Sequence, residues 1–449
     1  MTSLSQPQVT LIVLNWNARA FLEPCLRSLL AQTGPSFQVW LVDNDSSDDS
    51  IALVQANFPQ VQIWANRQNL GFSGGNNIAL REVQTPYAVL LNPDIVAEPD
   101  WLTQLLIPLE NDPTIGIAGC KLFYPDGRLQ HAGGFLHLPL GLADHFGYLA
   151  QDSGQFETVQ DVPYVIGAAL AVRRSVWETV GLLDEGFFLY YEDTDWCQRV
   201  HRQGWRVVVV PQARLVHHES VLTEKNSLTY LRNFHYGRWR YLLKHLPPEQ
   251  LLNETIPAEK AWLASKPERE QHAAAAAYHH LVTHLDETWA ARVRDGNNAI
   301  SPTQDEAITA ALHHLHHLAW TSAAYTQLHS WQTRLEQIAT WSIPAFRSPT
   351  PILGPLFNIL RTLWSYLDTR PALEPIRQQQ SHLNQQMAAI TTGYLRYLET
   401  RHNHSEAKTN QHDQWHDQLR HLRHQLAQAH AHLDKLEAHL QQLERPRQL

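Results

Sequence analysis

The sequence has few cysteines, no excess of positive charge and no long uninterrupted apolar run. Its 449 residues include only three cysteines, Cys25, Cys120 and Cys197, which are far apart and form no CxxC pair. We therefore expect neither a disulfide framework nor a cysteine-based zinc site, and a reducing compartment fits. The formal net charge of −9 argues against a phosphate-binding basic surface, so we expect no nucleic-acid partner.

Segments that direct a chain to a membrane are equally scarce. The polar residues 1–8 and the short apolar run after them do not form a signal peptide. The longest apolar stretch, residues 351–367, contains proline and polar residues and is shorter than the ~20 residues that cross a bilayer. We expect a cytoplasmic protein, with peripheral contact to the inner face of the membrane as the alternative.

Glycine and histidine divide the chain near residue 250. Seventeen of the 20 glycines precede this point, and 19 of the 27 histidines follow it. Because glycine marks tight turns, the first half is typical of a loop-rich α/β domain, whereas the second half is rich in helix-forming residues. We predict a domain at residues 1–248, a helical region at 249–400 and a coiled-coil helix at 401–449.

Short apolar runs alternate with helical patterns in the first half. The predicted strands are 9–14, 39–42, 61–65 and 87–91. The predicted helices between them are 18–31, 51–57 and 76–83. This alternation predicts a mostly parallel sheet with helices on both faces, which binds ligands at the carboxyl ends of its strands.

Polar residues follow these strands. Asn15 and Asn17 come after the first strand, Asp43 after the second, and Asn92-Pro93-Asp94 after the fourth. A carboxylate such as Asp94, placed after a rigid proline, is suited to hold a divalent cation against a diphosphate. An Asx-turn is the alternative explanation for it.

A glycine-rich segment lies between the third strand and its helix. Within it, Gly71, Gly74 and Gly75 stand between Asn69 and Asn76 and would let the backbone approach a ligand closely. The segment matches neither a Walker A motif nor a GxGxxG fingerprint. A simple strand-to-helix turn explains it equally well.

The densest group of acids precedes a helical pattern at residues 196–203. Helix capping accounts for at least one of Glu192, Asp193 and Asp195, but three acids exceed that need. A carboxylate among aromatic residues is a candidate general base. A short strand at 207–210 follows, and His217 then lies in a predicted loop, as a metal ligand or as a polar loop residue.

Five segments in this order suggest a known family. They are VTLIVLNWNARAFLEPCLRSLLAQ, VWLVDNDSSDDS, NRQNLGFSGGNN, LLNPD and GLLDEGFFLYYEDTDWCQRVHRQGWRVVVVPQARLVHH, within residues 8–245. Together they resemble the inverting family 2 glycosyltransferases with a GT-A fold, especially the rhamnosyltransferase-like branch. The resemblance implies a Rossmann-like α/β domain, followed here by an all-α region that ends in a coiled coil.

The resemblance also implies roles for the donor side of the site. Asn15 and Asn17 would line the nucleotide pocket, and Asp43 would bind the base or the ribose. The residues near the nucleotide and the donor sugar would be Asn69, Gly71, Gly74, Gly75 and Asn76. Asp94 and His217 would hold Mg²⁺ or Mn²⁺ on the donor diphosphate.

On the acceptor side, the resemblance implies that Asp193 is the catalytic base, beside Glu192 in the same acidic pair. Trp196 would lie near the acceptor. The reaction would move a sugar, with dTDP-rhamnose among the candidate donors, to a hydroxyl of a growing cell-surface glycan or lipid-linked glycan. The family's metal motif has an aspartate where this chain has Asn92, and we interpret this departure as a subtype.

Two other functions remain open from the sequence. A non-catalytic scaffold would bind a nucleotide sugar and act through its coiled coil. A nucleotidyltransferase could use a similar sheet and metal, but it explains the pair Glu192 and Asp193 less well.

The second half has features of architecture more than of chemistry. Apolar residues at alternating spacings of four and three, from Trp415 to Leu443, predict the coiled coil and hence a homo-oligomer. The histidines at 313–317 favour a solvated helix surface over a metal site, because no cysteine and few acids accompany them. An apolar stripe at 356–367 favours packing within the helical region, and membrane contact is its alternative.

Overall fold

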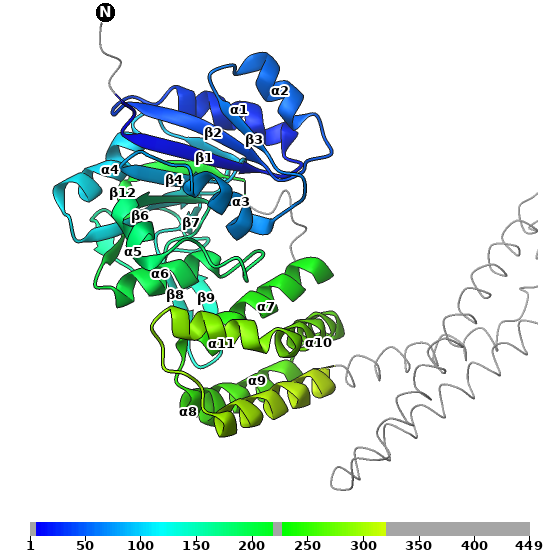
Figure 1. Cartoon of the computed structure of the whole chain (residues 1–449). Coiled ribbons are helices and arrows are strands. Elements are labelled where there is room, and N and C mark those ends of the chain that lie inside the picture. The colour runs from blue at the N-terminus through cyan, green and yellow to red at the C-terminus, as the bar shows by residue number, and fades with distance from the viewer. Residues whose placement is uncertain (1–5, 219–226, 320–449) are drawn as a thin grey trace, which may run out of the picture. The chain divides into compact units, whose positions relative to one another are not determined.

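The computed structural model describes residues 6–218 and 227–319, which belong to one compact unit, Met1–Trp320 (Figure 1). The predicted coiled coil at 401–449, the stripe at 356–367 and most of the predicted helical region at 249–400 lie outside the described residues. Homo-oligomer formation through the coiled coil stays a prediction, as do the bounds of the three domains.

A ten-stranded sheet forms the centre of the unit. Its main path is β10-β12-β6-β11-β4-β1-β2-β3, with β5 paired to β12 and β7 paired to β6, while β8 and β9 form a separate hairpin. The strands are β1 Val9–Asn15, β2 Phe37–Asp43, β3 Gln62–Ala65, β4 Tyr87–Leu91, β5 Ile95–Ala97, β6 Ile115–Phe123, β7 Leu129–His131, β8 Gly134–His137, β9 Leu142–His145, β10 Gln160–Asp161, β11 Ala169–Arg173 and β12 Arg206–His217.

Helices cover the sheet and continue after it. They are α1 Arg19–Leu30, α2 Ser50–Asn57, α3 Gly71–Leu80, α4 Trp101–Asn111, α5 Arg174–Val180, α6 Glu192–Arg202, α7 Leu228–His245, α8 Pro248–Gln250, the π-helical turn η1 Leu251–Thr255, α9 Ile256–Ala264, α10 Glu268–Thr283, α11 Leu285–Arg294 and a helix over 302–319. The α/β class is thereby confirmed.

The sheet is mixed rather than uniformly parallel. Strands β1 to β4 pair in parallel, as the sequence predicts, and β12 also runs parallel to β6. The exception at the centre is β11, which runs antiparallel to both β4 and β6. The carboxyl ends of β1, β2 and β4 therefore share one edge, which is where the sequence predicts the site.

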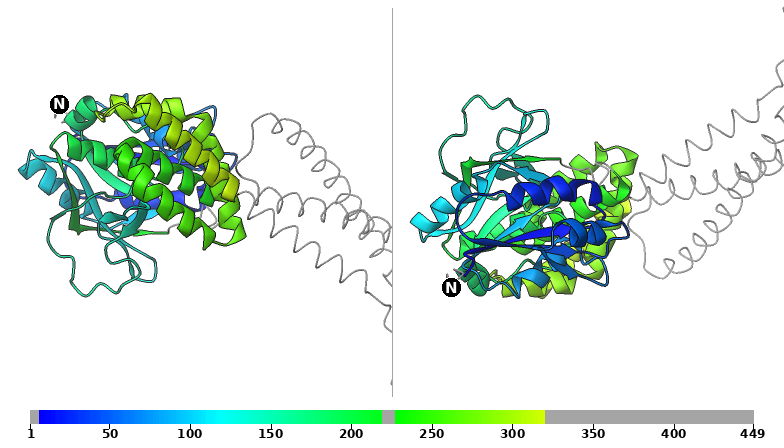
Figure 2. Two further views of the ribbon diagram at one scale, coloured as in Figure 1. Left: turned by 90° about the horizontal axis from the view of Figure 1, so that it is seen from below. Right: turned by 90° about the horizontal axis from the view of Figure 1, so that it is seen from above.

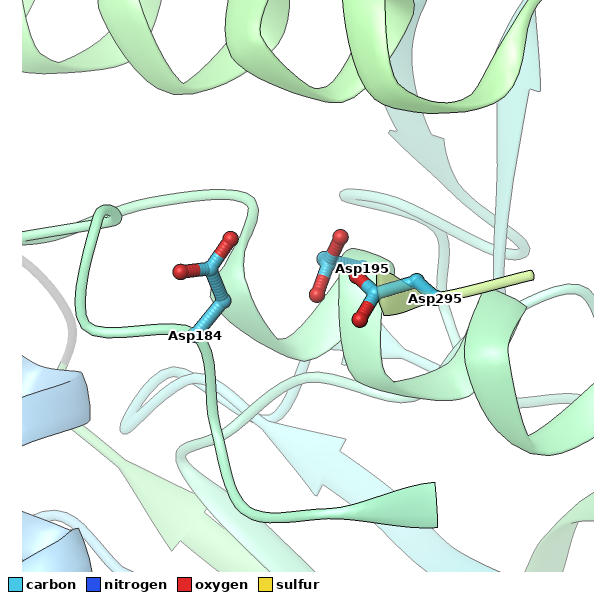
Figure 3. Close-up of side chains that lie close together, drawn as sticks. All are labelled: Asp184, Asp195 and Asp295. Atoms are coloured by element: carbon cyan, nitrogen blue, oxygen red, sulfur yellow. The ribbon is translucent and has the colours of Figure 1, made fainter. Parts of the chain in front are cut away.

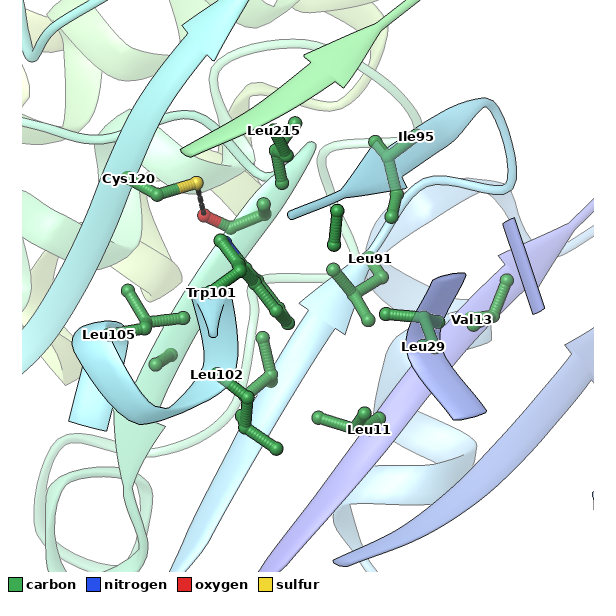
Figure 4. Close-up of a cluster of buried hydrophobic side chains, with 14 of the residues drawn as sticks. Leu11, Val13, Leu29, Leu91, Ile95, Trp101, Leu102, Leu105, Cys120 and Leu215 are labelled. Atoms are coloured by element: carbon green, nitrogen blue, oxygen red, sulfur yellow. Dashed lines mark hydrogen bonds between the residues drawn. The ribbon is translucent and has the colours of Figure 1, made fainter. Parts of the chain in front are cut away.

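Every residue of β1 is buried, because its side chains alternate between two apolar layers. Leu11 and Val13 face the layer under α1 and α4, which Figure 4 shows around Trp101. Ile12 and Leu14 face the layer formed with α3, α5 and α6. The continuous apolar run of this strand is typical of a sheet that is covered on both faces.

The helices after β12 have a core of their own. It includes Trp239 from α7, Tyr278 from α10 and Leu312 from the helix over 302–319. These helices gather beside the sheet, below it in Figure 1 and toward the viewer in the left panel of Figure 2. Within residues 6–218 and 227–319, we find no helix that is both long enough and apolar enough to cross a membrane.

Three predicted boundaries were wrong, and each error concerns the site. Helix α3 begins at Gly71 and not at Asn76, so the glycine-rich segment is mostly helical. Helix α6 begins at Glu192, which puts the acids in its first turn. Strand β12 continues to His217, so this histidine ends a strand instead of lying in a loop.

Candidate active site

The ends of β1 and β2 bring two predicted donor residues together. Asn15 and Asp43 are register partners, and the Asn15 Nδ2 donates to Asp43 Oδ1 at 2.7 Å. The other carboxylate oxygen of Asp43 accepts from the backbone N–H of Ser46 at 2.9 Å, and Asp43 is buried. Asn17 has a φ of 52°, and its side-chain oxygen accepts from the backbone N–H of Ser47. The turns after β1 and β2 are therefore held together by their own polar side chains.

The glycine-rich start of α3 lies against these turns. Gly71 has a φ of 70°, and a Cβ there would collide with the Phe188 carbonyl oxygen. A Cβ on Gly75 would meet Leu14 Cδ1 at 2.5 Å, and one on Gly74 would meet Leu70 Cβ at 2.8 Å. Glycine at these positions lets the helix approach closely, but toward protein atoms.

Two asparagines flank these glycines. Asn69 Oδ1 accepts from the N–H of Gly71 at 2.9 Å and so supports the first turn of α3. The Asn76 amide group is buried and donates to the Phe72 carbonyl oxygen at 3.0 Å. Sequence reasoning overlooked Asn44, which donates to both Asn69 Oδ1 and the Gly71 carbonyl oxygen and so joins the end of β2 to α3.

Asp94 and His217 meet at the end of β4. Asp94 Oδ1 lies 3.2 Å from His217 Nε2, and both side chains are buried. Asn92 Nδ2 lies 3.3 Å from the same nitrogen, and the other ring nitrogen, Nδ1, lies 2.8 Å from Gln130 Oε1. Asn92 and His217 are 125 positions apart in the sequence. They converge because the end of β12 pairs with β5, the strand that begins directly after Asp94.

The hydrogen-bond partners of His217 indicate which nitrogen carries the proton. Gln130 Oε1 only accepts, so Nδ1 donates to it, and the amide of Asn92 donates to Nε2. Nε2 then carries the lone pair, which accepts from Asn92, and it lies 3.2 Å from Asp94 Oδ1, which is buried and accepts no hydrogen bond from the described residues. Two ligands of a small cation, each ~2.1 Å from it, are typically ~3 Å apart. Asp94 and His217 therefore fit a divalent cation.

Glu192 and Asp193 open α6 beside the antiparallel strand β11. Asp193 is half-buried; its Oδ2 accepts from the N–H of Gly167 at 2.8 Å, and its Oδ1 from the N–H of Thr194 at 2.6 Å. Burial raises the pKa of Asp193, although these backbone donors oppose the rise. Burial raises the pKa of Glu192 further, and repulsion from Asp193 adds to it.

The backbone before this pair is strained. Tyr190 and Tyr191 have φ values of 75° and 70°, in the left-handed region that costs a non-glycine residue of order 1–3 kcal/mol. The Tyr191 hydroxyl donates to the Gly141 carbonyl oxygen at 2.8 Å. A Cβ on Gly237 of α7 would collide with the Tyr190 carbonyl oxygen, so this helix packs directly on the turn. The strain is thus held in place by the hairpin region and by α7.

A short chain of contacts joins the acidic pair to the metal-ligand pair. The backbone N–H of Gly167 donates to Asp193. The next residue, Ala168, accepts a hydrogen bond from the N–H of Asn92 at 3.0 Å through its carbonyl oxygen. The side chain of Asn92 in turn contacts His217. Asp193 and Asp94 therefore lie in one region, at the common edge of β4 and β11.

Trp196 does not have the position that the resemblance implies. Its side chain is fully buried among the apolar residues under α6, and its indole N–H donates to the Gly181 carbonyl oxygen at 2.9 Å. A helix that begins at Glu192 points its fifth residue into the core. A side chain without exposed surface cannot touch an acceptor, so we withdraw this assignment.

A second group of acids has the spacing of metal ligands. Asp184, Asp195 and Asp295 bring carboxylate oxygens within 4.8 Å of one another (Figure 3). However, Lys244 Nζ lies 2.8, 2.5 and 2.8 Å from these three carboxylates. Arg240 binds Asp184, and Arg199 binds Asp195. The cations of the chain already occupy this cluster, so it is a buried ion network and no metal site.

Three useful residues escaped sequence reasoning. Gln130, Asn44 and Gly167 act through a side-chain oxygen, an amide and a backbone N–H, none of which has a sequence signature of its own. Gln130 does precede His131 and a pair of glycines, which is the one local pattern that could have drawn attention to it. The position of Gly167 follows only from the pairing of β4 with β11.

Comparison with known proteins identifies the domain. Residues 10–181 match the family described as glycosyl transferase family 2. This match covers less than half of the chain and places a domain similar to that family at residues 10–181. The matched segment includes Asp94 but ends before Glu192, Asp193 and His217.

Curated relatives match about half of the chain. An O-antigen biosynthesis protein of Myxococcus xanthus is 32% identical over 232 residues, which cover 49% of this chain and 18% of that protein. An uncharacterised protein of Sinorhizobium fredii is 30% identical, over 48% of this chain and 25% of that protein. An N-acetylglucosaminyl-diphospho-decaprenol L-rhamnosyltransferase of Mycobacterium tuberculosis is 25% identical, over 51% of this chain and 82% of that protein. The chain thus matches a quarter or less of the length of the first two.

Proposed function

We propose that this chain is an inverting glycosyltransferase that moves a sugar from a nucleotide-diphosphate donor to a hydroxyl of a cell-surface or lipid-linked glycan. Asp193 is the general base, and Glu192 is its neighbour in the catalytic pair. Rhamnose, carried as dTDP-rhamnose, is the first donor to test, because one relative is named a rhamnosyltransferase and another an O-antigen biosynthesis protein.

The observation that supports this proposal best is the environment of Asp193. Both of its oxygens are oriented by backbone N–H groups, so the carboxylate has one defined position. Its raised pKa makes it a stronger base than an ordinary aspartate. A base held in this way removes the proton from an acceptor hydroxyl as the hydroxyl attacks the anomeric carbon. One displacement with one base inverts the configuration of that carbon.

The donor side is assigned to the other residues at the same edge of the sheet. Asp94 and His217 would hold Mg²⁺ or Mn²⁺, which when bound neutralises the charge that develops on the diphosphate leaving group. The turns with Asn15, Asn17 and Asp43 and the glycine-rich start of α3 would hold the nucleotide and the donor sugar. Asn92 orients His217 and replaces the first acid of the family's metal motif.

The non-catalytic scaffold is not favoured. A domain without turnover has no need for a buried acidic pair with raised pKa values beside two strained residues, because each of these features costs stability. Their presence together supports catalysis.

The test is transfer by Asp193→Asn with a panel of nucleotide sugars and glycan acceptors, in Mn²⁺. We expect turnover to fall by ~10²–10⁴-fold, because the amide cannot accept the proton. Donor binding, measured by thermal stabilisation, stays within about twofold of that of the parent, and NMR of the parent's product shows the inverted anomer. The matched control, Asp161→Asn, changes an exposed aspartate on β10 and keeps full activity.

Equal turnover in Asp193→Asn and the parent would remove Asp193 as the base. Binding of a nucleotide sugar without transfer to any acceptor would instead favour the scaffold. A product that retains the anomeric configuration would contradict the single displacement.

A further inference from the structure

Gln130 has an unusual place beside the proposed metal ligands. It is the middle residue of β7, it is buried, and it contacts two histidines from different elements. Its side-chain Oε1 accepts from His217 Nδ1 at 2.8 Å. Its backbone carbonyl oxygen lies 3.1 Å from His145 Nδ1 and therefore accepts from that nitrogen. A single residue thus selects the protonated nitrogen in both rings.

The consequence for His217 is chemical. A neutral imidazole has one N–H and one lone pair, and only the lone pair binds a metal. With its proton held on Nδ1 by Gln130, the ring keeps its lone pair on Nε2, which lies 3.2 Å from Asp94 Oδ1 and accepts from Asn92, a donor that a cation would displace. Without Gln130, the proton could move to Nε2 and donate to Asp94, and the two groups would then satisfy each other without a cation.

We propose that Gln130 is a positioning residue that prepares His217 for a divalent cation by holding its proton on Nδ1. This inference rests on the proposed function, since it assigns Gln130 a role in the metal site of that reaction. It adds to the proposed metal site a residue that lies outside the family's sequence motifs. Outer hydrogen-bond partners of metal-bound histidines typically change metal affinity by ~10–100-fold.

His145 provides an internal reference. Its Nδ1 donates to the main chain of Gln130, so this hydrogen bond survives any change of the side chain at position 130. Substitution of Gln130 by methionine removes the acceptor and keeps a buried side chain of similar length. Gln130→Glu keeps an acceptor oxygen at the same place. Among the described residues, Gln130 Nε2 has no acceptor, so the loss of this amide nitrogen breaks no hydrogen bond.

The first measurement is the protonation state of the His217 ring, by nitrogen-15 NMR of the metal-free protein. His217→Gln serves to assign the resonance. We expect Nδ1–H in the parent and in Gln130→Glu, and a population of at least half Nε2–H in Gln130→Met, with His145 unchanged in all three. An Nε2–H or doubly protonated His217 in the parent would overturn the inference, as would unchanged Nδ1–H in Gln130→Met.

The second measurement is Mn²⁺ affinity, by electron paramagnetic resonance with Mn²⁺ alone and with dTDP. We expect Gln130→Met to bind Mn²⁺ ~10–100-fold more weakly than the parent, and Gln130→Glu to bind it within a few-fold. Gln32→Met is the matched control, because Gln32 is also buried and makes three hydrogen bonds away from the site. It should leave Mn²⁺ affinity unchanged.

The two measurements separate this inference from the proposed function. If the parent binds no Mn²⁺, the metal-assisted part of the proposed function fails, and the NMR result alone decides the role of Gln130. If the parent binds Mn²⁺ and Gln130→Met binds it equally well, the role of Gln130 fails and the proposed function stands.

Discussion

Two buried clusters in this protein contain acidic side chains, and they differ in whether a lysine or arginine of the chain balances the negative charge. In the network of Asp184, Asp195 and Asp295, the ammonium of Lys244 touches all three carboxylates. At the end of β4, Asp94 Oδ1 lies 3.2 Å from a histidine nitrogen that carries a lone pair. The charges of the first group are balanced by described residues of the chain, whereas we propose that the second group receives a cation.

The difference shows that the proximity of acids is a poor sign of a metal site. The network has three carboxylates within 4.8 Å of one another, and the proposed metal pair has only one carboxylate. What distinguishes the two groups is the number of cations that the chain itself supplies. Among the described residues, no lysine or arginine pairs with Asp94, whereas Lys244 alone pairs with all three acids of the network.

The network also has a clear structural task. Asp195 belongs to α6, the helix that begins with Glu192 and Asp193, while Lys244 lies in the last turn of α7 and Asp295 follows α11. The ions therefore join the strand-rich part of the unit to the helices that follow it. The position of Asp193 depends on residues beyond the matched family segment.

The largest effect is expected from breaking the network. Lys244→Met removes the cation that the three acids share, and an uncompensated buried charge typically costs ~3–5 kcal/mol. We expect the free energy of unfolding, measured in urea, to fall by that amount. Lys260→Met, the same change at an exposed position of α9, should stay within ~0.5 kcal/mol of the parent. A loss below ~1 kcal/mol for Lys244→Met would mean that Arg199 and Arg240 suffice.

The opposite result is expected for the proposed metal pair. Asp94→Asn replaces a carboxylate oxygen that accepts no hydrogen bond from the described residues by a group that can donate to His217 Nε2. We expect the stability of the metal-free protein to be unchanged or higher, while Mn²⁺ affinity falls ~100-fold, or ~2.7 kcal/mol. Calorimetric titration with Mn²⁺ and dTDP checks this. Asp126→Asn, at an exposed turn, is the control, and equal affinity in Asp94→Asn and the parent would exclude Asp94 as a ligand.

The sequence predicted the fold where the pattern is local. Apolar runs located β1 to β4 to within two residues at each end, because buried parallel strands consist of almost nothing else. The start of α3 was missed, because glycine is a poor helix former and its place in the first turn is decided by close packing on Phe188 and Leu14. Antiparallel β11 was missed as well, since its partners lie far away in the sequence.

The same division applies to the site. Asp94, Asp193 and His217 could be proposed from the sequence because each follows or ends a recognisable segment. Gln130 was not found, because its role depends on a hydrogen bond between residues 87 positions apart. Trp196 was placed near the acceptor by the resemblance, and the structure instead buries it as the fifth residue of α6. Residues that act through another side chain require the tertiary structure.

The smallest effect in this comparison concerns pH. Burial opposes the ionisation of Asp184, but attraction by Lys244 and Arg240 outweighs it and lowers the pKa of Asp184 to about 2, from 3.8. A lowered pKa stabilises the fold fully above pH ~4, and this contribution is lost as the pH falls toward 2. We expect Asp184→Asn to cost ~2 kcal/mol at pH 6, and the difference from the parent to shrink below pH 4.

Urea unfolding of parent and variant at a series of pH values measures this difference. The neighbouring residue provides the control: Glu185 is paired with Arg81 at an exposed position, so Glu185→Gln should cost less than ~1 kcal/mol at every pH. A cost for Asp184→Asn that does not change between pH 6 and pH 3 would mean that its hydrogen bonds matter and its charge does not. The network would then hold the helices through hydrogen bonds and packing rather than through electrostatic attraction. The balance of charge would no longer distinguish the network from Asp94.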